Sequence, residues 1–428
     1  MNAPLPAAIG QAWVERLAAS ECPALTTRRK RREEQTGASH DPIVWTEARG
    51  ANVLDVDGNR YVDLTSGFGV ALIGHRHPRV VEALKSQADR LLHALGDLHP
   101  SDRKVELLER LCALSPWREA RAMLSLSGAD AVTAALKTAV LATGRPGVIA
   151  FEGGYHGLSY GPLAVSGYAE RFRAPFREQL QAKVSFAPWP SDEAAVARTL
   201  AALPHDWSEI GAVILEPIQG RAGVRVPPKG FLATLERISH EHGALLIVDE
   251  IFTGLGRCGS WWRSTEDGAV PDLLCVGKAL GGGLPISACL GKEEVMAAWG
   301  TPDEEAIHTG TFYGDPLGCA AALATLELIE SDGLIDAAAS RGHAFADALR
   351  SSSASGITEV RQVGMLLGLQ LEEPMQALSL ARRLLERGYL VLPAGAEADV
   401  LQLAPPVTLT DAQRDAFIEA LVAAMEGA

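Results

Sequence analysis

Three polar side chains in the middle of the chain follow short apolar runs, each close to the point where the run ends. Glu216 and Asp249 come directly after two of these runs, and Lys278 lies two residues beyond a third. Continuous apolar runs are typical of strands buried on both faces of a parallel sheet, and sites in such sheets lie at the carboxyl ends of the strands. A lysine at such a place, with its pKa lowered by burial, can act as a nucleophile and as a general acid and base.

Each of these positions has an ordinary structural explanation as well. A carboxylate at a strand end can cap a following helix, and Asp249 alone fits that role equally well. Lys278 fits a structural role poorly, because it lies between an apolar strand and Ala279-Leu-Gly-Gly-Gly283, where a lysine would not be well solvated. Three polar strand ends on one sheet, one of them a lysine, therefore favour a catalytic site.

A turn at Ser127-Gly-Ala-Asp130 adds a way to bind an anion. A glycine such as Gly128 lets the backbone approach a ligand closely, and the first-turn N–H groups of a helix that starts at Ala129 would favour a phosphate. Most turns of this kind bind nothing, so the turn supports a site only together with other residues.

The elements that must position these residues alternate from about residue 120 onward. Apolar runs predict strands, and longer stretches with apolar residues at helical spacing predict the helices between them. The expected strands cover residues 122–126, 147–151, 211–215, 244–248 and 272–276, and the expected helices cover 129–141 and 231–242. This order predicts an α/β fold with a mostly parallel central sheet covered by helices.

The two ends of the chain have sequence patterns that differ from that of the middle. An Ala-rich helix at residues 335–349 leads into a Ser/Gly-rich segment, and Asp57-Gly58 near the N-terminus is a strong hairpin signal. Further strand-like pieces cover residues 359–371, 388–392 and 400–403. We expect residues 1–70 to contribute to a small α+β domain, residues 71–325 to form the large domain, and residues 326–428 to complete the small domain.

Composition and charge exclude several classes of protein. The 428 residues carry a net charge of −14, which would repel DNA or RNA. The basic cluster at 28–32 is followed at once by Glu33 and Glu34, so we interpret it as a solvated helix face. No apolar run reaches membrane-spanning length, and the N-terminus lacks the pattern of a signal peptide. We therefore expect a cytoplasmic protein without a nucleic-acid or membrane partner.

Cysteine and histidine spacing gives no sign of a metal. The six cysteines contain no C-x-x-C pair. His75 and His77 form one close pair and His240 and His242 another, but no carboxylate or cysteine completes either set at convincing spacing. We expect no bound metal.

Residues 43–425 resemble the class III pyridoxal-phosphate-dependent aminotransferases of fold type I. The most specific block runs from Val248-Asp-Glu-Ile-Phe to Cys258-Gly259 and continues through residues 271–285, with Asp249 and Lys278 separated by 29 positions (278 − 249). Supporting matches cover residues 151–157, 215–220 and 308–312. The resemblance implies a small α+β domain beside a large cofactor domain.

The resemblance also implies the chemistry. Pyridoxal 5′-phosphate takes up charge from a substrate carbanion, and a buried carboxylate at Asp249 would keep its pyridine nitrogen protonated. Lys278 would hold the cofactor as an aldimine, give it up to the substrate amine, and then move the proton. The activity implied is ping-pong transfer of an amino group from an amino acid or amine donor to an α-keto acid.

The resemblance assigns the remaining cofactor contacts residue by residue. Tyr155 would stack on one face of the cofactor ring and Ile251 would support the other, while Glu216 would lie beside the phenolic oxygen. Gly128 and Ala129 would bind the phosphate, and Thr311 would reach it from the neighbouring subunit of a homodimer with shared active sites. Without the lysine block, Tyr155 and Ile251 would be ordinary core residues and Thr311 a turn residue.

Several positions depart from the commonest family pattern. Phe252 replaces a frequent Gln and Asp315 replaces a frequent Asn. On the substrate side, Arg221 replaces a Glu, Gln402 replaces an Arg and Phe68 replaces a Tyr. In many relatives the Glu and the Arg pair, and the Arg is released to bind a substrate carboxylate. Arg221 could bind that carboxylate from a new direction, or it could be a structural arginine. The ornithine or 4-aminobutyrate specificity of those relatives should therefore not be carried over to this chain.

The sequence also allows three other interpretations. Gly157-Leu-Ser159-Tyr-Gly161 matches the serine-hydrolase elbow, which would make Ser159 a nucleophile, but an elbow lies directly between a strand and a helix. Here the expected strand ends near Phe151, and Pro162 follows in place of a helix. A non-catalytic protein would not need both Lys278 and Asp249. A racemase, aminomutase or decarboxylase using the same cofactor remains an alternative, because the fold does not fix which bond breaks.

Overall fold

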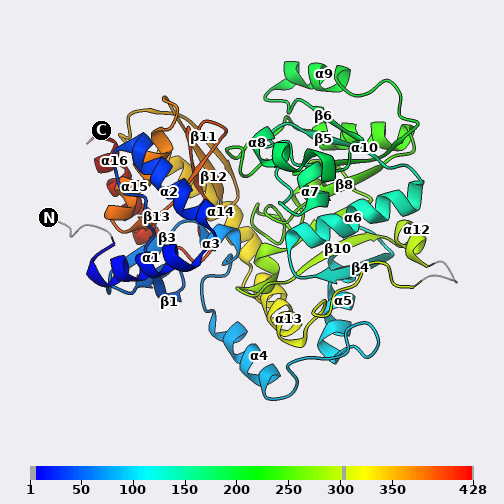
Figure 1. Ribbon diagram of the computed structural model, residues 1–428, viewed down its shortest axis with the longest axis horizontal. Helices are drawn as coiled ribbons and strands as arrows, with labels where there is room; N and C mark the ends of the chain where they lie inside the picture. The colour runs from blue at the N-terminus through cyan, green and yellow to red at the C-terminus, as the bar shows by residue number, and fades with distance from the viewer. Residues whose placement is uncertain (1–5, 301–304, 427–428) are drawn as a thin grey trace. The chain divides into compact units, whose positions relative to one another are not determined.

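The computed structural model describes residues 6–300 and 305–426, which form two compact units (Figure 1). The described residues up to His77, together with those from Ser340 onward, make the first unit, and Pro78–Ala339 make the second. The boundary expected after residue 325 falls inside helix α13 (Pro316–Ser331), which packs against α4 (Pro78–Ala88) and α5 (Asp102–Leu114) of the second unit.

The second unit is built on a seven-stranded sheet with the order β4-β10-β9-β8-β7-β5-β6. All neighbouring pairs are parallel except those of β10, which runs antiparallel to β4 and β9. The strands are β4 (Ala120–Ser125), β5 (Gly147–Phe151), β6 (Val184–Ala187), β7 (Ile210–Leu215), β8 (Leu245–Asp249), β9 (Leu273–Val276) and β10 (Ser287–Lys292). The prediction of a mostly parallel sheet is confirmed, and all the expected strands form.

The sequence predicted two helices in the second unit, and both form: α6 (Gly128–Thr143) and α10 (Phe231–Glu241). Ser127 caps α6, because its side chain accepts a hydrogen bond from the Asp130 N–H, and Gly144 ends the helix in the left-handed conformation. The remaining helical segments are α7 (Tyr160–Ala164), α8 (Glu170–Arg173), η1 (Ala174–Gln179), α9 (Glu193–Ala201), α11 (Arg263–Glu266), η2 (Lys278–Gly281), α12 (Glu293–Met296) and η3 (Ala297–Trp299).

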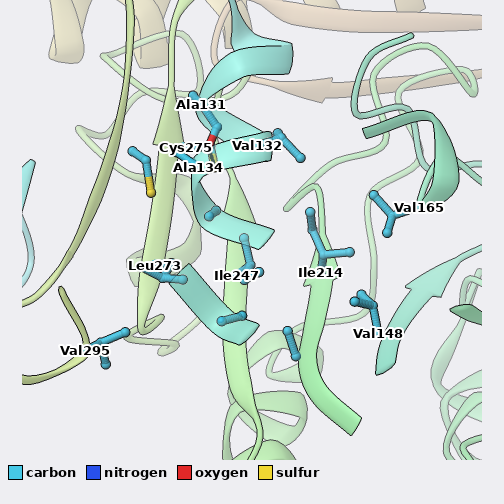
Figure 2. Packing of buried hydrophobic residues seen from close by; sticks show 14 of the residues in the cluster. Ala131, Val132, Ala134, Val148, Val165, Ile214, Ile247, Leu273, Cys275 and Val295 are labelled. Atoms are coloured by element: carbon cyan, nitrogen blue, oxygen red, sulfur yellow. Dashed lines mark hydrogen bonds between the residues drawn. The ribbon is translucent and has the colours of Figure 1, made fainter. Parts of the chain in front are cut away.

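The core of this unit lies between α6 and the sheet. Small residues on α6, among them Ala131 and Ala134, let the helix lie close to apolar side chains such as Ile214, Ile247 and Leu273, all fully buried (Figure 2). Burial of each of the larger side chains stabilises the fold by about 1.5–3 kcal/mol. This packing fixes the N-terminus of α6 against the carboxyl ends of the central strands.

The first unit contains two four-stranded sheets, ordered β1-β2-β3-β13 and β11-β12-β15-β14. The strands are β1 (Trp45–Arg49), β2 (Asn52–Asp55), β3 (Arg60–Asp63), β11 (Ile357–Val363), β12 (Leu366–Leu371), β13 (Tyr389–Leu390), β14 (Leu392–Ala394) and β15 (Val400–Leu403). Gly58 has a φ of 84° in the turn between β2 and β3, so the hairpin prediction is confirmed. β13 pairs with β3 and thereby joins the two ends of the chain.

Helices complete the first unit. They are α1 (Ala8–Ser20), α2 (Pro23–Thr36), α3 (Ser66–Gly69), α15 (Gln376–Glu386) and α16 (Asp411–Glu426), while α14 (Leu334–Arg350) runs across the boundary of the two units. The basic cluster at 28–32 lies on α2, as predicted for a solvated helix. Within the described ranges, the helices are all too short or too polar to cross a membrane.

Candidate active site

Polar residues gather where the central strands of the seven-stranded sheet end. In the parallel register Leu215 is opposite Val248 and Asp249 is opposite Cys275, so neighbouring strands end at nearly the same level. Glu216, Asp249 and the turn that carries Lys278 therefore leave the sheet at one edge. This is the edge at which open parallel sheets bind their ligands.

Asp249 is held by two hydrogen bonds. Its Oδ2 lies 2.8 Å from Nδ1 of His156, and its Oδ1 accepts a 3.1 Å hydrogen bond from the Ile251 N–H. Both Asp249 and His156 are buried. Burial alone would lower the pKa of His156, but the hydrogen bond and charge of Asp249, with the charge of Glu216, raise it overall. The pair thus favours an imidazolium beside a carboxylate.

His156 is a functional candidate that the sequence reasoning missed. It stands beside Tyr155 in the matched block 151–157, and that block was the available signal. Its backbone N–H donates to Ser166 Oγ at 3.0 Å, while its Nε2 has no hydrogen-bond partner among the residues that the structure describes.

Glu216 is buried and ties two loops together. Its Oε1 accepts a 2.8 Å hydrogen bond from the Tyr155 N–H, and its Oε2 accepts one of 3.2 Å from the Gly220 N–H. Burial raises the pKa of Glu216 to about 7, and the charge of Asp249 adds to the effect, against opposing contributions from His156, the Tyr155 N–H and Lys278. A carboxyl with such a pKa can hold or release a proton near neutral pH.

Lys278 begins the short helix η2 with a φ of 43°, a left-handed conformation that costs energy in a residue other than glycine. Burial lowers the pKa of Lys278, while the negative charges of Asp249 and Glu216 oppose that shift. Its Nζ lies 4.1 Å from the centre of the Phe252 ring. The lysine is therefore partly buried, lies over one aromatic ring and has two carboxyl groups nearby.

The start of α6 is packed tightly against Ile251. A Cβ on Gly128 would lie 2.7 Å from Cδ1 of Ile251, so only glycine fits there without a shift. Ser287 Oγ donates a 2.6 Å hydrogen bond to the Ser127 carbonyl and holds the turn. The first N–H groups of a helix have no acceptor within the helix, so those of Gly128 and Ala129 are suited to an anion.

Arg221 lies in the loop after β7, among aromatic rings. Its guanidinium carbon is 4.5 Å from the ring centre of Tyr155, 4.9 Å from that of Tyr168 and 5.5 Å from that of Phe172. Sequence reasoning singled out Arg221 but not Tyr168 or Phe172.

Three further positions were predicted for the site, one on the second unit and two on the first. Thr311 is exposed on the second unit, next to the exposed Phe312. Phe68 and Gln402 belong to the first unit: Phe68 is 70% exposed on α3, and Gln402 is buried in β15. The structure thus groups the expected cofactor residues of the second unit, except Thr311, and leaves two of the three substrate candidates on the first.

The two alternative kinds of site, a serine nucleophile and a metal site, receive little support from the structure. Ser159 lies well beyond the end of β5, although the expectation that no helix follows it was wrong, because α7 begins at Tyr160. In the part of the chain that is described, no group of three or more His, Cys, Asp or Glu could hold a metal. His75 pairs with Asp63, and His240 pairs with Asp272.

Comparison with known sequences identifies the family. Residues 35–425 match the family model of the class III aminotransferases. The acetylornithine aminotransferase of Mycobacterium bovis is 39% identical over 394 residues, which cover 90% of this chain and 92% of that protein. The acetylornithine aminotransferase of Methanosarcina mazei is 35% identical over 382 residues, which cover 89% of this chain and 91% of that protein.

Solved structures agree with the sequence relatives. An amine transaminase from an uncultivated Pseudomonas species, solved with pyridoxal phosphate bound, superimposes with a TM-score of 0.84 at 30% identity, over 90% of this chain and 95% of that one. The ornithine aminotransferase of Toxoplasma gondii gives a TM-score of 0.80 at 29% identity, over 92% of this chain and 93% of that one.

The chain belongs to the class III aminotransferases. It is a pyridoxal-phosphate-dependent enzyme that transfers an amino group from a donor to a keto acid, which confirms the fold, cofactor and reaction expected from the sequence.

Proposed function

We propose that Lys278 is the residue to which pyridoxal phosphate is attached and that it moves the proton during transamination. The observation that carries this proposal is the convergence of Lys278, Asp249 and Glu216 at the aligned ends of β9, β8 and β7. The cofactor, when bound, supplies an electron sink for the charge that develops at the substrate Cα. A lysine must be neutral to accept a proton, and the lowered pKa of Lys278 increases its neutral fraction near neutral pH.

Asp249 is proposed to keep the pyridine nitrogen protonated. Its carboxylate is held by His156 and by the Ile251 N–H, so its position is fixed before any ligand arrives. The raised pKa of His156 keeps a positive charge next to the Asp249 side chain. An ionised, buried carboxylate is the partner that a protonated ring nitrogen requires.

The remaining proposed cofactor contacts involve residues at the same edge of the sheet. Gly128 and Ala129 would donate backbone N–H groups to the phosphate at the N-terminus of α6. Ile251 and Tyr155 would contact the two faces of the ring. Glu216, whose pKa is raised to about 7, would lie beside the phenolic oxygen and can share a proton with it.

We further propose that the enzyme is a homodimer with shared active sites. The loops at residues 91–98 and 305–312 are joined by a 3.0 Å hydrogen bond from Thr309 Oγ1 to Asp97 and by contact of the His93 and Phe312 rings. They expose large apolar side chains, namely Leu92, Leu95, Leu98, Ile307 and Phe312. Exposed apolar groups that lie close together mark an interaction surface. Thr311 lies within it and would reach the phosphate of the partner subunit.

The natural substrates are proposed only by class. The similar proteins include acetylornithine, ornithine and amine transaminases, so likeness alone does not select one substrate. We propose an amino acid or amine donor and an α-keto acid acceptor. Arg221 and Gln402 are positions at which this chain departs from relatives that act on ornithine or aminobutyrate, and Phe68 replaces a Tyr of some relatives. We propose all three as contributors to substrate choice.

Borohydride reduction of the holoenzyme tests the central proposal. We expect mass spectrometry to place the reduced cofactor on Lys278. Lys278→Ala should bind no cofactor covalently and lose transaminase activity, whereas Lys85→Ala, at an exposed lysine of α4, should keep both. An adduct on another lysine would refute the assignment.

A further inference from the structure

Arg221 is enclosed by an aromatic cage, which we define as Tyr155, Tyr168 and Phe172. The cage is continuous, since the rings of Tyr155 and Tyr168 meet edge to face with their centres 6.2 Å apart, and the rings of Tyr168 and Phe172 are tilted against each other with their centres 6.0 Å apart. All three ring centres lie within 5.5 Å of the guanidinium carbon. A cation in contact with several rings is held by their quadrupoles and loses much of its conformational freedom.

Aromatic contacts leave the hydrogen-bonding capacity of the guanidinium unused. Its N–H donors lie in the plane of the group, so they can still bind a carboxylate through two parallel hydrogen bonds. Among the described residues, Arg221 has no ion pair and donates no hydrogen bond. Arg221 is partly buried, which strengthens any charged hydrogen bond that it makes.

The charges around the cage also favour an anion. Arg171 places a second guanidinium 5.4 Å from the Phe172 ring. The nearby Glu170 is already paired with Arg173 and Arg177. Glu216 has its carboxyl oxygens occupied by backbone N–H groups. No acidic group of the described chain therefore neutralises Arg221.

The cage is attached to the catalytic edge of the sheet through Glu216. That carboxyl group holds the backbone of Tyr155 with one oxygen and the backbone of Gly220, the residue before Arg221, with the other. Tyr155 is thus both a wall of the cage and the proposed stacking partner of the cofactor. An anion bound at Arg221 would lie next to the place where the substrate reacts.

We propose that Arg221, oriented by Tyr155, Tyr168 and Phe172, binds the carboxylate of the α-keto acid acceptor and so determines substrate specificity. This inference rests on the proposed cofactor site at Lys278. Tyr168 and Phe172 are positioning residues that hold the guanidinium plane ready for a bidentate contact.

The test separates recognition of the carboxylate from the rest of the reaction. Holoenzyme converted to its amino form is mixed with pyruvate, with 2-oxoglutarate or with propanal, which lacks the carboxylate, and the return of the original absorbance is followed. In Arg221→Ala we expect kcat/KM for both keto acids to fall roughly 10- to 100-fold, the usual effect of losing a charged hydrogen bond, with little change for propanal. Arg221→Lys should recover part of the loss.

Arg173→Ala is the matched control. Arg173 also lies over an aromatic ring, 4.1 Å from the centre of Phe186, and pairs with Glu170 outside the cage. We expect its keto-acid kinetics to equal those of the wild type. Within the cage, Tyr168→Leu should raise the keto-acid KM several-fold, whereas Tyr168→Phe, which keeps the ring, should not.

A measurement without turnover completes the design. Glutarate and propionate should bind the wild-type holoenzyme in calorimetry and bind Arg221→Ala more weakly, whereas propionamide should not distinguish the two proteins. Equal losses for propanal and keto acids, or an unchanged keto-acid KM, would overturn the carboxylate role. Mapping the borohydride adduct in each variant keeps this result apart from the Lys278 proposal, because the adduct should stay on Lys278 throughout.

Discussion

Nδ1 of His156 lies 2.8 Å from Oδ2 of Asp249, and both residues are buried at the carboxyl edge of the central sheet. The two residues are 93 positions apart in the chain: Asp249 ends β8, whereas His156 lies in the loop that follows β5. One carboxylate oxygen of Asp249 is therefore already paired with a charged partner, and the orientation of the carboxylate depends on His156.

Replacement of His156 should impair the enzyme through Asp249. In His156→Ala the carboxylate loses a charged hydrogen bond, so we expect kcat to fall roughly 10- to 100-fold and the cofactor to bind more weakly. His156→Gln should recover part of the activity, since an amide can still donate to Asp249. Steady-state kinetics and cofactor titration measure both effects, with exposed His205→Ala as the control. Wild-type activity in His156→Ala would show that the pair is dispensable.

Glu216 should make stability depend on pH in the cofactor-free protein. Its pKa rises from 4.5 in the reference state to about 7 in the fold, so its contribution to stability is complete below about 4.5 and is lost as pH rises through about 7. Between about pH 5 and pH 8 we expect the wild type to lose about 2–3 kcal/mol of unfolding free energy relative to Glu216→Gln. Urea unfolding at both pH values provides the comparison, and parallel pH profiles of the two proteins would contradict the shift.

Lys278 should react with amine reagents at lower pH than an ordinary lysine. Burial lowers its pKa, so its neutral fraction at a given pH exceeds that of a free lysine side chain. Carbamylation of the cofactor-free protein with cyanate, followed by peptide mass spectrometry, should give a pH midpoint for Lys278 below the value of about 10.4 of a free lysine side chain. A midpoint at or above that value would count against a lowered pKa.

Gly128→Ala should damage the phosphate end of the site. The new Cβ would lie 2.7 Å from Ile251 Cδ1, so the helix start or Ile251 must move, at a cost of about 1–3 kcal/mol. We expect weaker cofactor binding and a lower unfolding free energy. Ile251→Val in the same chain removes the Cδ1 methyl group and should restore part of both. If the double variant is no better than Gly128→Ala, the steric explanation is wrong.

The exposed apolar loops predict a dimer that should dissociate when a charged residue is introduced into them. Leu95→Glu or Phe312→Glu places a carboxylate in a surface that we propose is buried between subunits, so the protein should sediment as a monomer and bind cofactor less tightly. Leu25→Glu makes the same change at another exposed leucine, on α2, and should leave the oligomer intact. A Leu95→Glu protein that remains dimeric would place the interface elsewhere.

Much of the fold was predictable because the central strands are continuous apolar runs. β5, β7, β8 and β9 are buried along nearly their whole length, so their composition marks them. β10 was not predicted, since Ser287 and Lys292 at its ends and Gly291 within it interrupt the apolar pattern.

The candidate site was predictable only in part. Residues at strand ends can be recognised from a single segment of sequence, as Lys278 and Asp249 were. The partnership of His156 with Asp249 and the enclosure of Arg221 by Tyr168 and Phe172 depend on side chains brought together by the fold. Tyr168 and Phe172, four positions apart, have the spacing of any amphipathic helix and give no sign of a guanidinium partner.

Lys278 has a left-handed backbone conformation, which glycine adopts more readily than a residue with a side chain. A residue with a side chain costs about 1–2 kcal/mol more than glycine in that conformation, and Gly277 and Gly282 show that the chain uses glycine freely around it. At this proposed cofactor lysine the demands of folding and of catalysis therefore oppose each other, and the lysine is present in spite of its backbone conformation. Stability gained by relaxing this turn would come at the expense of the reaction, so the site sets a limit on how robust the fold can become while it remains an enzyme.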